Sequence, residues 1–195
     1  KMKIKKRQLD IIEAAGEILT NSGINGLTIK KLAAKIGFSE SALYRHFEGK
    51  EEIIITMLQY LSEDMDNRIN SCIKNIVDPV EKLKAVFNDH FDFFKEKPYF
   101  LVAIFSEGLL QESKTINDSI MKIIDINKKY LLDIVEQAQQ QNIFNKFLSA
   151  EDLVHIIMGS FRLHLLKWRL SGYTFDVKQK GNMLMSNILT LITLK

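Results

Sequence analysis

The residues with the most distinctive chemistry in this sequence form one short run, Tyr44-Arg45-His46. A phenol, a guanidinium and an imidazole all make hydrogen bonds, and the guanidinium of Arg45 presents its donors as a planar fork. Leu43 and Phe47 flank the run four residues apart, so they share one face of a helix. Such a run is hard to explain as core. It indicates a helix that buries its apolar side and presents polar groups to a partner.

The uneven distribution of charge suggests that this partner is anionic. Residues 1–50 contain 10 Lys and Arg against 5 Asp and Glu, a balance of +5, whereas residues 51–195 contain 17 against 19, a balance of −2. A basic front on a mildly acidic body favours an anionic partner such as nucleic acid for the front. The alternative is a solvated surface with uneven charge.

Two short helices joined by a tight turn must hold this polar run in place. Apolar residues recur at helical spacing over residues 29–36, between an N-cap hydroxyl on Thr28 and the helix breaker Gly37. Ser39 offers the cap of a second helix that ends near Phe47. This pattern inside a basic segment predicts a helix-turn-helix, in which the second helix enters the major groove of DNA.

The rest of the chain also has helical periodicity, and no run alternates apolar and polar residues for long enough to make a sheet. We expect an all-α fold of about nine helices, with a DNA-binding domain over residues 1–49 and a helical body over residues 50–195. The helices expected in the body cover residues 50–76, 79–95, 98–111, 115–140, 150–170 and 176–194.

Several classes of protein are disfavoured by what the sequence lacks. It has no apolar stretch as long as a membrane helix, and its single cysteine, Cys72, excludes internal disulfides and Cys-based zinc sites. It has no glycine-rich phosphate loop, no nucleophile elbow and no histidine pair at metal-binding spacing. We therefore expect a soluble cytoplasmic protein that is not an enzyme and has no catalytic residue, metal or cofactor.

Several segments of the first 55 residues form a recognisable series at fixed spacing. They are Ile11-Ile12-Glu13-Ala14-Ala15, Gly23, Leu27-Thr28-Ile29-Lys30-Lys31-Leu32-Ala33, Ile36-Gly37-Phe38-Ser39-Glu40-Ser41-Ala42-Leu43-Tyr44-Arg45-His46-Phe47 and Lys50-Glu51-Glu52-Ile53. The series closely resembles the DNA-binding domain of the TetR family, the tetracycline-repressor-like bacterial regulators. Gly49 is one departure, because many members carry Ser or Thr there. Beyond residue 55 the resemblance is limited to helix number and length.

The resemblance implies two groups of DNA contacts. Those expected to bind the DNA backbone are Thr28, Tyr44, His46 and Lys50. Those expected to face base edges are Ser39, Glu40, Ser41 and Arg45. Arg45 is the expected partner of guanine, whereas Glu40 either accepts from cytosine or pairs with a neighbouring cation. Lys3, Lys5, Lys6 and Arg7 form either a basic arm or a solvated terminus.

The resemblance also implies a C-terminal helical bundle that binds an effector. Residues 87–105 concentrate aromatic side chains, which form either plain core or the wall of an apolar pocket. The candidate pocket residues are His90, Phe94, Phe105, Gln111, Tyr130, His155 and Arg162. A pocket of this composition suits a small hydrophobic or amphipathic molecule.

The last two predicted helices carry broad apolar faces, which the resemblance implies are used in a homodimer. The candidate interface residues are Leu153, Ile157, Ser160, Leu184, Ile188 and Leu191. The alternative is that these faces are buried within one monomer.

Together these features predict a dimeric repressor on a near-palindromic DNA operator, released when an effector shifts the helix over residues 50–76. The alternatives are an effector-independent DNA-binding protein of the same fold, or a helical carrier or enzyme with a vestigial DNA-binding domain.

Overall fold

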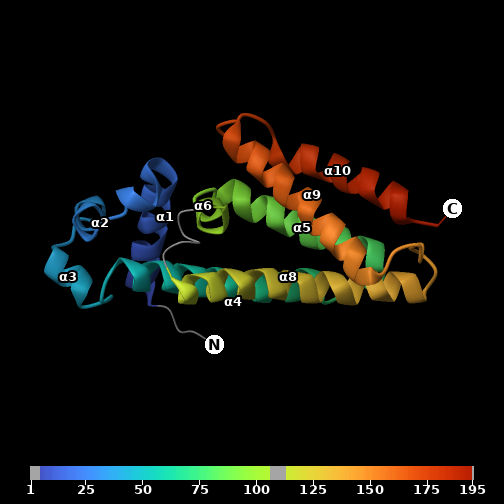
Figure 1. Cartoon of the computed structure of the whole chain (residues 1–195), viewed down its shortest axis with the longest axis horizontal. Coiled ribbons are helices and arrows are strands. Elements are labelled where there is room, and N and C mark those ends of the chain that lie inside the picture. The colour runs from blue at the N-terminus through green and yellow to red at the C-terminus, as the bar shows by residue number, and fades with distance from the viewer. Residues whose placement is uncertain (1–4, 106–112, 195) are drawn as a thin grey trace. The chain divides into compact units, whose positions relative to one another are not determined.

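The computed structural model describes residues 5–105 and 113–194, and these residues are helical apart from turns and one isolated bridge between Phe144 and Thr193. The prediction of an all-α fold is confirmed (Figure 1). The helices are α1 (Lys6–Gly26), α2 (Ile29–Ile36), α3 (Glu40–Tyr44), α4 (Lys50–Ile73), α5 (Pro79–Glu96), α6 (Phe100–Phe105), α8 (Lys114–Gln140), α9 (Ala150–Leu170) and α10 (Val177–Ile192).

The chain divides into two compact units. Residues 1–65 and 97–124 form the first unit, and residues 66–96 and 125–195 form the second. Helices α4 and α8 are each divided between the two units, with the first part in the first unit and the rest in the second. The division at residue 49 expected from the sequence concerns function, and it stays a prediction.

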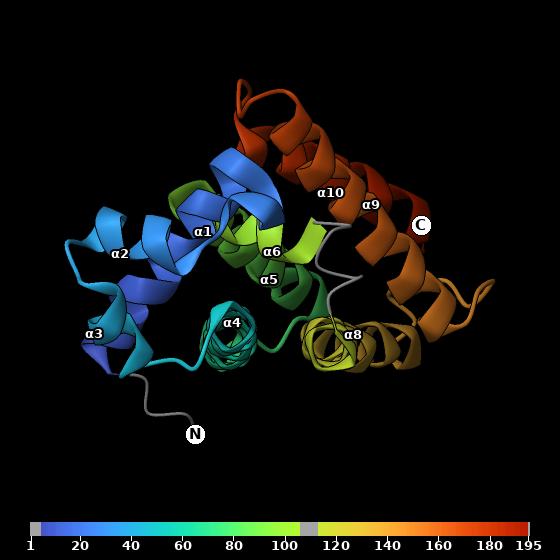
Figure 2. The same ribbon diagram turned by 60° about the vertical axis from the view of Figure 1, so that its left-hand side comes forward.

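In the first unit, α1 packs against α2 and α6, and α2 packs against α3 (Figure 2). Ile11, Ile12 and Leu19 lie on one side of α1 and are almost completely buried, as their helical spacing predicts. The backbone of α1 is kinked at Gly23, whose φ of 64° and ψ of −173° are non-helical.

The second unit is built around aromatic rings. Phe87 and Phe91 of α5 lie 5.2 and 5.4 Å, centroid to centroid, from Phe161 of α9. Helix α10 packs against both α5 and α9. None of the helices in the described ranges is both long enough and apolar enough to cross a membrane.

The predicted helix bounds differ from the observed ones mainly at α3. A helix over residues 39–47 was expected, but α3 ends at Tyr44, and the N–H of His46 donates to the carbonyl of Leu43, three residues back instead of four. This bond is of the 3₁₀ type and tightens the turn that follows α3. The expected helix over residues 98–111 begins as α6, and its second half lies outside the described residues.

Candidate nucleic-acid interface

Two side-chain caps fix the starts of α2 and α3. The hydroxyl of Thr28 accepts a hydrogen bond from the N–H of Lys31 at 3.2 Å, and that of Ser39 accepts from the N–H of Ala42 at the same distance. Both caps were expected from the sequence, and both are confirmed. They satisfy N–H groups that would otherwise lack partners at the exposed helix ends.

The turn between the two helices depends on Gly37. Its φ of 70° and ψ of 30° lie in the left-handed region, and its N–H donates to the carbonyl of Ala33. Side chains are disfavoured in this conformation because Cβ crowds the backbone. The glycine therefore allows α2 to stop and α3 to leave in a new direction within three residues.

The α3 segment divides its side chains between core and surface. Leu43 is completely buried and Phe47 is 3% exposed, whereas Tyr44 is 55% exposed. Arg45 is also exposed, and His46 is half-buried. The expected separation of an apolar face from the Tyr44-Arg45-His46 run is therefore present.

The residues expected at base edges lie at the start of α3. Ser39, Glu40 and Ser41 are all exposed. The hydroxyls of Ser39 and Ser41 are 3.0 Å apart, so the two serines hydrogen-bond each other, while Ser39 also caps the helix. This arrangement leaves Glu40 and the outer side of Ser41 facing solvent.

The start of α4 uses a capping interaction that the sequence analysis missed. The side chain of Glu52 reaches back to accept from the N–H of Glu48, across the position of Gly49. A carboxylate in the first turn also suits the helix dipole. The sequence feature that could have predicted this interaction is Glu52 itself, because a glutamate three residues after Gly49 has the spacing of a capping box. Lys50, the expected phosphate ligand, is half-buried at the first position of this helix.

Arg7 belongs to the folded part of the chain. It lies inside α1, and its guanidinium is 5.5 Å from the ring centroid of Phe38 in the turn between α2 and α3. Such a contact adds a modest cation–π attraction and ties α1 to this turn. Lys5 and Lys6 are exposed beside it, and Lys3 lies outside the described residues.

The residues expected to bind an effector do not gather in one place. His90 is buried between the rings of Phe87 and Phe161, and one of its ring nitrogens lies 3.2 Å from the amide oxygen of Asn127. Phe94 is also buried in the second unit, and the Tyr130 hydroxyl donates to Asp66 at 2.9 Å. The remaining candidates are dispersed: His155 and Arg162 are exposed on α9, Phe105 ends α6 in the first unit, and Gln111 lies outside the described residues.

Burial raises the pKa of Tyr130 to about 12, and the hydrogen bond to the Asp66 carboxylate adds to this effect. The hydroxyl therefore stays protonated at neutral pH and remains a donor to that carboxylate. In this geometry Tyr130 ties α8 to α4 within the second unit.

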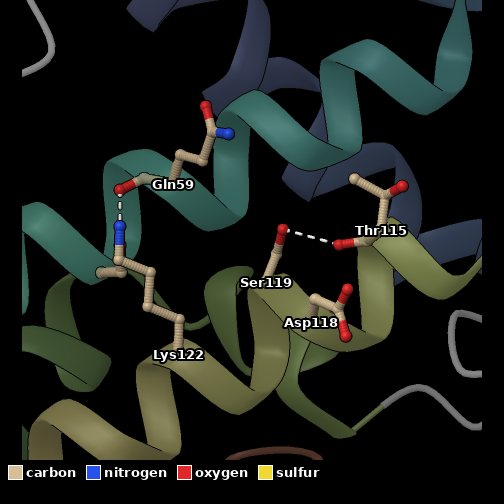
Figure 3. Close-up of a pocket in the computed structure, with 6 residues that line it drawn as sticks. Gln59, Thr115, Asp118, Ser119 and Lys122 are labelled. Atoms are coloured by element: carbon tan, nitrogen blue, oxygen red, sulfur yellow. Dashed lines mark hydrogen bonds between the residues drawn. The ribbon is translucent and has the colours of Figure 1, made fainter.

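A pocket of about 200 Å³ lies between α4 and α8 in the first unit (Figure 3). It is lined by Gln59, Ser62, Thr115, Asp118, Ser119 and Lys122. Each of these six side chains carries a polar group, and the candidate effector residues are not among them. In Figure 3 the hydroxyl of Ser119 donates to the carbonyl of Thr115, so this group is engaged within α8.

The candidate dimer residues separate into buried and exposed sets. Leu153, Ile157 and Ile188 are buried in the second unit of this single chain, Ser160 and Leu184 are half-buried, and Leu191 is exposed. Besides Leu191, the same two helices expose four large apolar side chains outside the candidate set, namely Ile156, Leu163 and Leu170 on α9 and Met183 on α10.

Comparison with known proteins bears on both parts of the chain. The model of bacterial regulatory proteins of the tetR family matches residues 11–57. The model described as YsiA-like protein, C-terminal region, matches residues 59–192, which is more than half of the chain. The chain belongs to the TetR family. All eight residues expected to contact DNA fall within the first match, in the part of a TetR-family regulator that forms the helix-turn-helix.

Individual relatives have low sequence identity to this chain, but the matches cover most of its length. The nucleoid occlusion factor SlmA of Vibrio cholerae is 27% identical over 136 residues, which cover 69% of either chain. The fatty acid degradation regulator FadR from Bacillus halodurans has a similar fold, with a TM-score of 0.86 at 19% identity over 96% of this chain and 97% of that one. FadR from Bacillus subtilis, solved in complex with stearoyl-CoA, has a TM-score of 0.82 at 20% identity, over 93% of this chain and 97% of that one. This TetR-family chain therefore shares the fold of these regulators.

We predict that Gly37→Ala lowers the free energy of unfolding by about 1–2 kcal/mol, because alanine is strained at this positive φ. Gly37→Asn is the matched control, since asparagine tolerates the left-handed region better. Urea denaturation of both variants checks the prediction. Equal stability of Gly37→Ala and the unmodified protein would contradict the role assigned to this turn.

Proposed function

We propose that this TetR-family chain is a transcriptional repressor that binds its operator through α3 and through the starts of α2 and α4. The observation that carries the proposal is the exposure of Tyr44 and Arg45, with half-buried His46 beside them, at the end of a helix anchored by buried Leu43 and Phe47. A single helix fits the major groove, and polar side chains at its outer surface meet base edges and phosphates there. In this proposal the N-terminal DNA-binding domain spans residues 1–49.

The proposed contacts follow the position of each group. Arg45 binds a guanine edge, while Tyr44 and His46 bind the sugar-phosphate backbone. Thr28 and Lys50 stand at the starts of α2 and α4, where N–H groups and the helix dipole favour a phosphate. Ser39, Glu40 and Ser41 complete the surface at the start of α3.

Two substitutions separate base recognition from phosphate binding. We predict that Arg45→Ala weakens operator binding by about 1–3 kcal/mol and relaxes the preference at one base pair. Lys50→Ala should weaken specific and random DNA alike and lower the salt slope of binding by about one. Fluorescence anisotropy on operator and scrambled duplexes at several salt concentrations measures both. An equal loss on both duplexes for Arg45→Ala would contradict base recognition.

We further propose that the protein acts as a homodimer through α9 and α10. Ile156, Leu163 and Leu170 are seven residues apart and form one exposed apolar row along α9. Met183 and Leu191 are exposed on α10, which packs against α9. Exposed apolar side chains that gather on one pair of helices mark an interaction site, and paired half-sites give a small helix-turn-helix its specificity. This row replaces the buried Leu153, Ile157 and Ile188 as the proposed interface.

Leu163→Glu tests the dimer because the side chain is 57% exposed and loses little packing within one chain. We predict a rise of at least about a hundredfold in the dimer dissociation constant, since an unpaired carboxylate would be buried. Met121→Glu on α8, at a side chain 51% exposed, is the matched control. Sedimentation equilibrium showing Leu163→Glu as dimeric as the control would contradict the proposal.

A small amphipathic molecule is the proposed effector, and a long-chain acyl-CoA is the class to test first. Support comes from the stearoyl-CoA complex of the structurally similar FadR from Bacillus subtilis. Release from DNA requires the effector to bind the form with low DNA affinity more tightly than the other form.

Titration of the operator complex with stearoyl-CoA tests this class. We predict release of DNA at micromolar ligand, measured by anisotropy, with free coenzyme A as the control that lacks the acyl chain. A shift of the equilibrium from about 1:99 to 99:1 needs a preference of about 10⁴-fold between the two forms. Binding of stearoyl-CoA to the protein is measured directly as well. If the protein is saturated with stearoyl-CoA and still holds the operator, acyl-CoA is not the effector.

A second function is favoured by the curated relatives. The SlmA proteins of Vibrio cholerae and Alteromonas mediterranea carry the name nucleoid occlusion factor, at 27% and 24% identity. A protein of that kind would bind many chromosomal sites without a metabolite. Recovery of bound fragments across the genome separates the two, because a few promoter sites favour the repressor and many dispersed sites favour the second function.

A further inference from the structure

The most exposed large apolar residue in the described part of the chain is Phe147, which lies in the turn over residues 141–149 between α8 and α9. Phe147 is 88% exposed, and the adjacent Leu148 is exposed as well. A phenylalanine buries about 150–250 Å² when it is covered by a partner. Single apolar residues on a surface are common, but this one is held by a tightly bonded turn beside other exposed apolar side chains.

The 141–149 turn is paired with the end of α10 and the residues that follow it, within the second compact unit (Figure 1). The N–H of Asn145 donates to the carbonyl of Ile192 at 2.7 Å, and the N–H of Leu194 donates to the carbonyl of Ile143 at 2.9 Å. Phe144, between these two bonds, is completely buried. The base of the turn is therefore fixed to the body of the unit.

Asn145 also fixes the tip of the turn through its side chain. Its amide oxygen accepts from the N–H of Phe147 at 3.3 Å, and its amide nitrogen donates to the carbonyl of Leu191 at 3.2 Å. The side chain of Gln139 donates to the carbonyls of both Asn145 and Leu148 at 3.0 Å. Because these bonds are already made in the single chain, little backbone freedom remains to be lost when Phe147 meets a partner.

The turn adjoins the apolar surface proposed for the homodimer at two places. Leu191, whose carbonyl is bonded to Asn145, is itself exposed on α10. Ser149, at the end of the turn, caps α9, and exposed Ile156 follows seven residues later, about 10 Å along the helix. Phe147 therefore lies beside the start of one dimer helix and the end of the other.

The area that a dimer needs also favours a contribution from Phe147. A stable interface buries about 800 Å² of each partner, and about 65% of a homodimer interface is apolar. A completely covered leucine, isoleucine or methionine side chain supplies about 60–120 Å². The five exposed apolar residues of α9 and α10 are only 48–77% exposed, so they supply about half of the apolar area required. The ring of Phe147 brings the total close to that area.

We propose that Phe147 is an anchor that packs against a second copy of this chain and extends the interface of α9 and α10. The inference rests on the proposed homodimer. Aromatic side chains are enriched in interfaces, and a few well-placed anchors carry most of the binding free energy. In this arrangement Phe147 makes the contact, and Asn145 is a positioning residue that holds the turn in the shape that presents it.

Phe147→Ser tests the anchor because so exposed a ring loses little packing within one chain. We predict that it raises the dimer dissociation constant at least about tenfold, measured by sedimentation equilibrium. Val77→Ser is the matched control, because Val77 is 81% exposed and lies between α4 and α5 in the same unit. The control should dimerise as the unmodified protein does.

Asn145→Ala tests the role of the turn without removing the ring. It breaks the side-chain bonds to Phe147 and Leu191, so we predict a weaker dimer with a smaller change than that of Phe147→Ser. Circular dichroism melting identifies a variant that fails to fold. If Asn145→Ala does not fold, Phe147→Ser and the crosslinking experiment below still test the anchor.

Photocrosslinking of the purified protein identifies what Phe147 touches. The photoreactive residue p-benzoylphenylalanine replaces Phe147 in one sample and Val77 in the other. Irradiation should give a covalent dimer from the first sample, with mass spectrometry locating the crosslink within residues 141–194 of the second copy. The sample substituted at Val77 should stay uncrosslinked.

The possible failures are distinguishable. If the unmodified protein sediments as a monomer at every concentration measured, the proposed homodimer fails and the anchor fails with it. If it is a dimer but Phe147→Ser dissociates no more readily than Val77→Ser, the anchor alone is overturned. Equal yields of crosslinked dimer from positions 77 and 147 would also overturn it. If Phe147→Ser weakens the dimer and Leu163→Glu does not, the anchor stands and the proposed surface on α9 fails.

Discussion

The interface proposed for DNA depends on the burial of two side chains. Leu43 and Phe47 fill the core beneath α3, and they hold a helix of five residues that is too short to be stable alone. Because α3 is anchored on that side, Tyr44 and Arg45 face outward and His46 stays half-exposed beside them. The caps on Thr28 and Ser39 and the left-handed Gly37 serve the same arrangement, since they set where α2 stops and α3 begins.

The local features of this interface were predictable because each depends on neighbours in sequence. A cap needs a hydroxyl and an N–H three residues later, and a left-handed turn needs a glycine, so Thr28, Ser39 and Gly37 were identified correctly. The length of α3 was overestimated, because the chain after Tyr44 forms a tighter turn in which the N–H of His46 donates to the carbonyl of Leu43. Periodicity does not reveal such a tightened turn.

The body was harder to predict because its helices have broad apolar faces. Periodicity showed that α9 is amphipathic, but not which strip is covered by α5 and α10. Leu153 and Ile157 are therefore core residues, while Ile156, the neighbour of Ile157 in sequence, and Leu163 remain exposed. His90 shows a related difficulty, since a polar residue in an apolar stretch was expected to line a pocket and instead packs between rings.

Chemical protection of guanines tests the central claim most directly. Dimethyl sulfate methylates N7 of guanine in the major groove, where α3 with Arg45 is placed by this account. The account predicts guanines protected in two major grooves on one side of the duplex, separated by about one helical turn or a multiple of it. It also predicts that Arg45→Ala removes protection at one guanine in each half-site. Bound DNA with every guanine N7 fully reactive would contradict the account.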